Sequence, residues 1–309
     1  MAHSFSLTSP QTAFAQDAWR HRVFLVSWIV SLIVFGAPLR GLVSLALHDD
    51  RYSHILLVPF VTAGILWLQQ KRILLDARYC PRVGIPLVLA GIALGCSGTI
   101  QRLSLGQNAS LAITAFAIVL TWTALFALCY GIQVVRSATF PLLFLLLMIP
   151  IPTPLIDEAV LGLQNGSAAM SYGLFKLVGI PVLRDGFQLS LPGLDIEVAK
   201  ECSGIRSSQS LFIASLLAGH LLLRSGWNQL WLVLLSVPIA IFKNAVRIVT
   251  ISSLGVYVDR GFLFGNLHRY GGLPFSLLAV GMLALVIRVL RKSEPHPESA
   301  DAVHNQSTR

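Results

Sequence analysis

The run Ala109–Tyr130 reads ASLAITAFAIVLTWTALFALCY and holds no charged residue. As an α-helix, which rises about 1.5 Å per residue, it would be roughly 33 Å long. The hydrocarbon core of a bilayer is about 30 Å thick and offers no water to backbone groups, so only a segment with internal hydrogen bonds can cross it. The run is therefore predicted to be a transmembrane helix.

The rest of the chain has the same apolar character. Of its 309 residues, 55% are hydrophobic and 12% are charged, and the mean hydropathy is +0.72. Soluble domains carry about a quarter charged residues, so an ordinary cytoplasmic enzyme, a disordered chain and a coiled coil are excluded. We predict an all-α polytopic membrane protein with about eight transmembrane helices. These predicted spans are Val23–Leu39, Ile55–Gln70, Val83–Ile100, Ala109–Tyr130, Ser137–Pro150, Ile205–Leu223, Trp227–Val249 and Leu273–Val289.

The connection between the fifth and sixth spans contains a weaker apolar stretch, Ile156–Ile180. Polar residues interrupt it, among them Asn165, Ser171 and Lys176. We interpret it as an interfacial or re-entrant helix. A ninth span is the alternative.

Apolar and polar residues alternate over 187–191 and again over 194–198, on either side of Pro192-Gly193. A period of two residues indicates a strand with one buried face, and Pro-Gly is typical of a tight turn. A small antiparallel β-hairpin is therefore predicted before the sixth span, on the outer surface.

The distribution of charge predicts the orientation of the spans. The chain has 23 Lys and Arg against 14 Asp and Glu, and cytoplasmic loops of membrane proteins collect basic residues. With the N-terminus inside, the inner segments hold 12 basic and five acidic residues and the outer segments hold nine of each, while Lys243 and Arg247 lie within the seventh span. No nucleic-acid partner is needed to explain the basic excess. Both termini are predicted to be cytoplasmic.

The chain is predicted to form one transmembrane domain, 23–290, between two short cytoplasmic segments. Residues 1–22 precede the first span and show no cleavable signal-peptide pattern. Residues 291–309 are polar, contain two prolines, and are predicted to be disordered.

The predicted topology separates the four cysteines. Cys80 falls in an inner loop, Cys96 within the third span and Cys129 near the inner end of the fourth, so only Cys202 faces outward. No metal-ligand spacing occurs, and neither a metal nor another cofactor is expected. Cys202 stands just before the helix that begins near Ile205, where the helix dipole favours a thiolate. The ordinary alternative for a lone cysteine is burial as a small packed residue.

Polar residues occur where the predicted spans should be apolar. Arg206 adds positive charge near the start of the sixth span or anchors it at the interface. Lys243, Asn244 and Arg247 lie in the seventh span, and no partner for Lys243 is apparent from the sequence. A charge inside a span is costly and by default indicates function, with snorkelling to the headgroups as the alternative.

His268 lies just before the last span, again on the outer side. A single loop histidine is more often solvated than catalytic. The topology, however, brings Cys202, Arg247 and His268 to one surface. A thiol, a guanidinium and an imidazole are the parts of a cysteine acyl-transfer site.

These elements together resemble the signature of the exosortase/archaeosortase family. The run Glu201–Ser207 (ECSGIRS) is similar to its active-site cysteine element, Asn244–Ile248 (NAVRI) to its Asn-x-x-Arg element, and His268–Phe275 to its His-x-x-x-Gly-x-x-Phe element. Upstream, Tyr52-Ser53-His54 resembles the family's N-terminal pattern.

The resemblance implies an integral-membrane cysteine peptidase and transpeptidase of the bacterial inner membrane, with its active site on the periplasmic side. Its partners would be exported proteins with a PEP-CTERM-type sorting tail, which has a Pro-Glu-Pro motif, one transmembrane helix and a basic end. The enzyme would cut near the motif and pass the protein to an acceptor, which the sequence leaves open among lipid, glycan, amine and water.

The resemblance also implies roles for single residues. Cys202 would be the nucleophile that forms a thioester, and His268 the general base or acid. Arg247 would stabilise the thiolate or the oxyanion. Asn244 would orient Arg247 or make a hydrogen bond between helices. Supporting roles are expected for Asn244, Arg206 and His54.

Two other classes of function remain open at this point. A transporter or channel would use Lys243 and Arg247 as ion or substrate contacts, although no inverted repeat is apparent. A scaffold subunit of an exopolysaccharide export or synthesis system would need none of the three candidate catalytic residues. Serine and zinc proteases are poorly supported, because the chain lacks a Gly-x-Ser-x-Gly element and paired histidine ligands.

Overall fold

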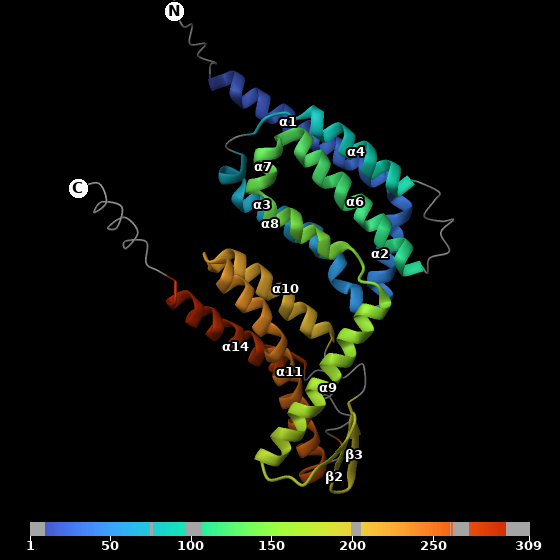
Figure 1. Cartoon of the computed structure of the whole chain (residues 1–309), viewed down its shortest axis with the longest axis vertical. Helices are drawn as coiled ribbons and strands as arrows, with labels where there is room; N and C mark the ends of the chain where they lie inside the picture. Colours follow the sequence, from blue (N-terminus) through green and yellow to red (C-terminus); the bar gives the residue numbers. More distant parts are fainter. Residues whose placement is uncertain are drawn as a thin grey trace, which may run out of the picture. The chain divides into compact units, whose positions relative to one another are not determined.

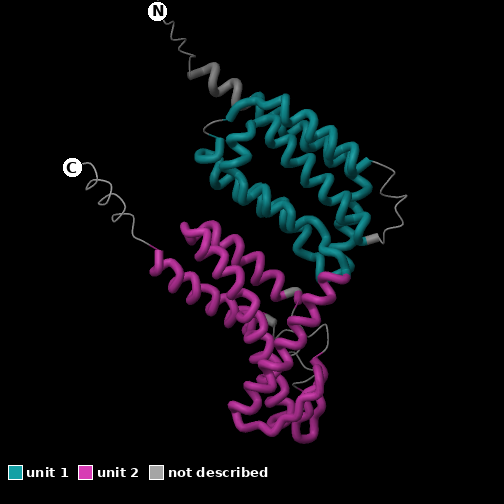
Figure 2. The backbone as a smooth tube through the Cα atoms, viewed as in Figure 1, with its two compact units in different colours: residues 1–153 teal, residues 154–309 magenta. Residues whose placement is uncertain are grey.

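The computed structural model describes residues 10–74, 77–96, 107–198, 205–259, 261 and 272–294. The side chains of residues 10–18, 107, 206 and 272 are outside this description. The chain forms two compact units, 1–153 and 154–309 (Figure 2). Helices dominate both units (Figure 1).

The first unit is built around one buried helix, α6. The indole of Trp122 on this helix donates a hydrogen bond of 3.0 Å to the hydroxyl of Ser31, and it also contacts the ring of Trp28. These contacts join α6 to α1, and α4 packs along α6 (Figure 1). The described elements of this unit are α1 (Pro10–Val34), α2 (Gly36–His48), η1 (Asp50–Leu56), α3 (Val58–Ile73), α4 (Pro81–Cys96), α6 (Gln107–Tyr130), α7 (Ile132–Ser137), α8 (Thr139–Phe144) and η3 (Leu145–Met148).

The close approach of α4 to α6 depends on glycine. A Cβ atom placed on Gly84 would lie 2.6 Å from the Cα of Leu128, whereas one placed on Gly64 of α3 would meet nothing within 4 Å. Gly84→Ala is therefore expected to destabilise the protein by about 1–3 kcal/mol, the usual cost of overpacking. The matched change Gly64→Ala should leave stability unchanged or raise it, because alanine favours a helix. Thermal unfolding in detergent checks both; equal melting temperatures for the two variants would contradict the packing.

A proline stands at the break inside one of the predicted spans. The predicted span Val23–Leu39 crosses the junction of α1 and α2, which meet at 75°. Pro38 cannot donate to the carbonyl four residues earlier, and its ring crowds that turn. The predicted span Val23–Leu39 is therefore bent and not one straight helix. The predicted span Ser137–Pro150 coincides with α8 and η3, which together form one apolar segment, 139–148, with Pro141 in its first turn.

Four of the described helices are long and apolar enough to cross a membrane: 50–73, 108–130, 226–257 and 273–292. The bent pairs 19–34 with 36–48, and 139–148 with 153–177, pass the same test when each pair is taken together, which raises the number to six. Shorter apolar helices occupy 81–96 and 207–222. A multi-pass membrane protein is thus confirmed, and the number of eight spans stays a prediction.

The second unit combines a small sheet with long helices. The stretch predicted as interfacial, re-entrant or a ninth span is one continuous helix, α9. The described elements are α9 (Thr153–Leu177), β1 (Leu183–Asp185), β2 (Gln188–Leu191), β3 (Leu194–Glu197), α10 (Ile205–Leu222), α11 (Gly226–Tyr257) and α14 (Gly272–Lys292).

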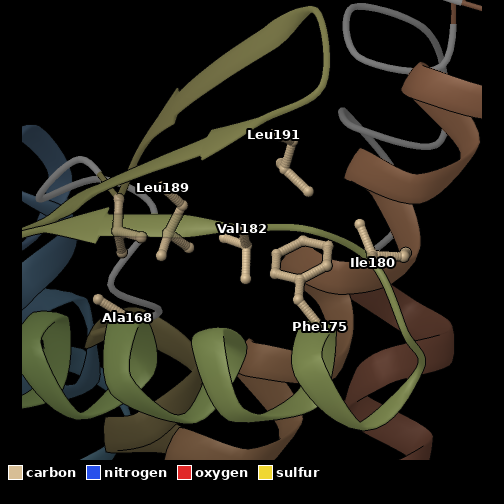
Figure 3. Close-up of a cluster of buried hydrophobic side chains, with 7 residues drawn as sticks. Ala168, Phe175, Ile180, Val182, Leu189 and Leu191 are labelled. Atoms are coloured by element: carbon tan, nitrogen blue, oxygen red, sulfur yellow. The ribbon is translucent and has the colours of Figure 1, made fainter.

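The sheet buries one face against α9. Strands β2 and β3 are those predicted on either side of the Pro-Gly turn, and they pair antiparallel with Leu191 opposite Leu194. The strand β1, which the sequence did not indicate, pairs with β2 to give the order β1-β2-β3. Leu189 and Leu191 point toward Ala168 and Phe175 of α9 (Figure 3). The location of this sheet on the outer side of the membrane stays a prediction.

One carboxylate joins the beginning of α11 to the end of α14. An oxygen of Glu294 accepts hydrogen bonds from the backbone N–H groups of Arg224 and Ser225, both at 2.9 Å, and from the amide of Asn228 at 3.2 Å. The N-cap residue Ser225 makes no capping bond through its own side chain. Glu294 therefore supplies the anionic cap that favours a helix N-terminus.

The bond from the Ser225 N–H is the main cause that holds the pKa of Glu294 below its usual value. A carboxyl whose pKa is lowered by folding stabilises the protein above its unfolded pKa, and this contribution is lost as the pH falls through the folded value. Glu294→Ala should thus lower the melting temperature at neutral pH, and the difference from wild type should shrink in acid. The neighbouring change Ser293→Ala is the control. A difference that is independent of pH would contradict the ionic cap.

Candidate functional site

The helix α11 carries the three polar residues of the seventh predicted span, Lys243, Asn244 and Arg247, within about one helical turn of one another. Its 32 residues make a helix roughly 48 Å long, which exceeds the about 30 Å of a bilayer core. Its C-terminal part packs on the cluster between α9 and the sheet, through Ile248, Val249 and Val256. Arg247 lies roughly 32 Å along the helix from Gly226, a distance close to the thickness of a bilayer core.

Asn244 and Lys243 are buried and joined to other helices of the unit. The amide of Asn244, 1% exposed, donates a hydrogen bond of 3.0 Å to the hydroxyl of Ser167 on α9. The ammonium of Lys243, 5% exposed, donates to the hydroxyl of Ser207 on α10. Asn244 thus makes the interhelical hydrogen bond that was one of its two alternatives, and its role in orienting Arg247 stays a prediction. The structure supplies for Lys243 a partner that was not apparent from the sequence.

A third polar contact joins α9 to Val198, the residue that follows β3. Gln164 of α9 is buried, and its amide nitrogen donates to the backbone carbonyl of Val198. Because Gln164 and Ser167 are three residues apart on α9, they lie on one face of that helix. The polar contacts therefore form one layer across α9, α10 and α11.

The structure places only part of the predicted catalytic set. Arg247 is half-buried on α11, one helical turn beyond Lys243. Cys202 lies in 199–204 and His268 in 262–271, both outside the described residues, as is the side chain of Arg206. The described chain reaches Val198 on one side of Cys202 and resumes at Ile205 on the other.

His54 belongs to the first unit and lies in η1. Its side chain is half-buried, and its Nδ1 atom is buried without a hydrogen-bond partner among the described residues. The neighbouring Tyr52 is 1% exposed and donates to the carbonyl of Ile151 at 3.0 Å. Asp49 pairs with Arg51 at 2.7 Å, and the hydrogen bond from that guanidinium keeps the pKa of Asp49 below its usual value. These contacts order the turn before α3.

Within the described part of the chain, no group of three or more His, Cys, Asp and Glu side chains could hold a metal ion. The described polar layer contains cations, hydroxyls and amides. Such groups can orient a peptide carbonyl and stabilise negative charge on its oxygen.

The helices able to cross a membrane define a multi-pass membrane protein. Within that class the chain belongs to the transmembrane exosortase family, whose model matches residues 42–285. Neither a curated protein nor a solved structure matches the chain. The matched range contains all three sequence elements that resemble the family signature, and also the upstream residues 52–54.

Gln164 and Ser207 were not predicted to belong to this polar layer. Gln164, Ser167 and Ser171 form a polar stripe at helical spacing, which is visible in the sequence once the segment is known to be a helix. The pairing of Lys243 with Ser207 joins residues 36 positions apart. It depends on how α10 and α11 are aligned, and their sequences do not specify this.

Proposed function

We propose that this protein is a membrane cysteine transpeptidase that removes C-terminal sorting tails from exported proteins. The observation that carries the proposal is the family match over 42–285, because this range contains the cysteine, arginine and histidine elements. The buried polar layer that contains Gln164, Lys243 and Asn244 supports it, because a bundle needing only apolar packing would not bury a lysine.

In the proposed reaction the thiolate of Cys202 attacks the carbonyl carbon of the scissile peptide bond. Arg247 donates hydrogen bonds to the oxyanion of the tetrahedral intermediate. The carbon–nitrogen bond then breaks, and His268 gives a proton to the leaving amine of the tail. The exported protein is left as a thioester on Cys202.

The second half of the reaction frees the enzyme. His268, now neutral, takes the proton of an acceptor hydroxyl, amine or water, and the acceptor attacks the thioester carbonyl. The carbon–sulfur bond breaks and the thiolate of Cys202 is restored. The acceptor thus decides between transfer and hydrolysis.

The proposed orientation follows from charge. With both termini in the cytoplasm, the end of α11 that carries Arg247 lies at the outer face of the inner membrane. The transmembrane helix of a substrate would lie beside α10, α11 and α14, and its basic end would remain on the cytoplasmic side. This presents the motif of the tail at the level of Arg247.

The experiment that tests this function uses the native host. The gene is deleted and restored as wild type or as Cys202→Ser, and the C-terminal peptides of membrane and secreted proteins are compared. We expect tailed proteins to keep their C-terminal helix in the deletion and in the Cys202→Ser strain, and to lose it with wild type. Identical peptides in the wild-type and Cys202→Ser strains would contradict the proposal and favour a transporter or scaffold.

A further inference from the structure

The second unit contains a pocket at the corner where α9 is followed by the sheet. Its volume is about 570 Å³, which lies within the range of ligand-binding pockets. The chain leaves α9 through Gly179, whose φ of +80° allows the backbone to reverse, and the N–H of Ile180 then donates to the carbonyl of Phe175 at 2.9 Å. Residues 180–183, which lead into β1, and residues 190–192, which end β2, line the pocket.

The lining of this pocket is mainly apolar. Val182 and Leu191 are buried and belong to the cluster that also contains Phe175 of α9 (Figure 3). Pro181 and Pro192 also line the pocket and have no backbone N–H, so neither position offers a donor to a polar ligand. The lining therefore suits a hydrocarbon chain better than a peptide backbone.

Among the described residues that line the pocket, Lys176 is the one that carries a charge. Its ammonium lies 4.4 Å from the centroid of the Tyr172 ring, one helical turn earlier. A lysine in the last turn of a helix can serve the free carbonyls there, but this ammonium is directed to the preceding turn. The carboxylates of the sheet, Asp185, Asp195 and Glu197, do not line the pocket. A cation beside an apolar pocket matches a ligand that combines an anionic group with a hydrocarbon chain.

Large aliphatic side chains at the same corner are exposed. Leu177 is 82% exposed, Val178 is 66% exposed and Leu183, at the start of β1, is 77% exposed. Packing within the unit does not account for them. Exposed apolar side chains next to a basic residue are typical of a surface that lies among the headgroups of a bilayer.

We propose that this pocket binds one anionic phospholipid, with an acyl chain between residues 180–182 and 190–192 and the phosphate at the ammonium of Lys176. The helices able to cross a membrane bring a bilayer to this chain, so such a ligand is always at hand. The bound lipid holds the corner formed by α9 and the sheet at the membrane interface. The site does not depend on the proposed reaction.

The test uses the full-length protein in detergent micelles that contain phosphatidylglycerol with a photoreactive diazirine in its acyl chain. Labelled peptides are identified by mass spectrometry, and the mole fraction of lipid that half-saturates labelling of residues 177–192 is determined. We expect Lys176→Gln to raise this mole fraction about fivefold, as the loss of one basic contact with an anionic headgroup does. The matched change Lys71→Gln removes the same charge from an exposed position in the first unit and should leave labelling of residues 177–192 unchanged.

A second pair of variants tests the apolar part of the site. Leu183→Ser removes a hydrocarbon contact and should also raise the half-saturating mole fraction about fivefold. Its control is Leu273→Ser, since Leu273 on α14 is 73% exposed and does not line the pocket. All four side chains that are changed are exposed, so the variants should fold, and their melting temperatures check this.

The lipid headgroup separates the two parts of the proposal. Phosphatidylcholine with the same photoreactive chain has no net charge and should need a higher mole fraction than phosphatidylglycerol. Equal values for the two lipids, or for wild type and Lys176→Gln, would overturn the contact between Lys176 and the phosphate. Labelling of α10, α11 and α14 with none in residues 177–192 would overturn the pocket as a lipid site. Displacement of the label by a peptide with an acidic residue between prolines, but not by unlabelled phosphatidylglycerol, would assign the pocket to a peptide instead.

Discussion

Replacing Cys202 with alanine is expected to abolish processing of tailed substrates while the protein still folds and inserts. The thiolate is the only group of the proposed site that forms a bond to the substrate, so its loss removes the covalent pathway. Loss of a nucleophile costs roughly 10⁴-fold or more in kcat in enzymes of this kind. The measurement is kcat on a tailed substrate in isolated membranes.

The other cysteines provide the control for this variant. Cys80 is half-buried and Cys129 is buried, and both belong to the first unit. Cys80→Ser is expected to keep the wild-type kcat. Cys202→Ser should be as inactive as Cys202→Ala, because a hydroxyl is far less ionised than a thiol at neutral pH. Processing that survives in Cys202→Ala would exclude the thiol mechanism.

Arg247 carries the second large expected effect. It is half-buried on α11, one turn from Lys243. A half-buried guanidinium is less screened by water, so as a donor to the oxyanion it stabilises this charge more than it would in bulk solvent. Arg247→Ala is expected to lower kcat by roughly 10²- to 10³-fold, as the loss of an oxyanion donor does.

Arg247→Lys distinguishes hydrogen bonding from charge. Lysine keeps the charge but lacks the planar pair of donors, so we expect it to restore little of the lost kcat. The control is Arg184→Ala, since Arg184 is also half-buried in the same unit and donates to the Asn165 side chain and the Gly186 carbonyl. If Arg247→Lys kept full activity, the positive charge of Arg247 would be sufficient and its paired donors would not be needed. Equal losses in Arg247→Ala and Arg184→Ala would contradict a specific role.

Most of the secondary structure could be predicted from the sequence because each signal is local. The uncharged run 109–130 is a helix, and the alternation around Pro192-Gly193 gives two paired strands. The bend near Pro38 was also encoded locally, but mean hydropathy across a span does not register the missing N–H of one proline. The strand β1 has only three residues, too few for a period to appear.

The polar residues of α11 were predictable from the sequence, and their contacts were not. Lys243, Asn244 and Arg247 stand out because polar residues are rare in an apolar helix. Their partners Ser207 and Ser167 do not, since serine is common in membrane helices and its role depends on which helix faces it. The hydrogen bond from Gln164 has the backbone carbonyl of Val198 as its acceptor. Every residue has such a carbonyl, so the sequence does not indicate which one is bound.

The most direct test of the account is capture of the covalent intermediate. A tailed substrate is mixed with the membrane enzyme, the reaction is stopped in acid, and the peptide containing Cys202 is analysed by mass spectrometry. A parallel sample receives hydroxylamine, which cleaves thioesters. We expect a substrate acyl group on Cys202, and release of the exported protein with a C-terminal hydroxamate that is absent with Cys202→Ala. Cleavage of the tail by wild-type enzyme with neither the adduct nor the hydroxamate would contradict it.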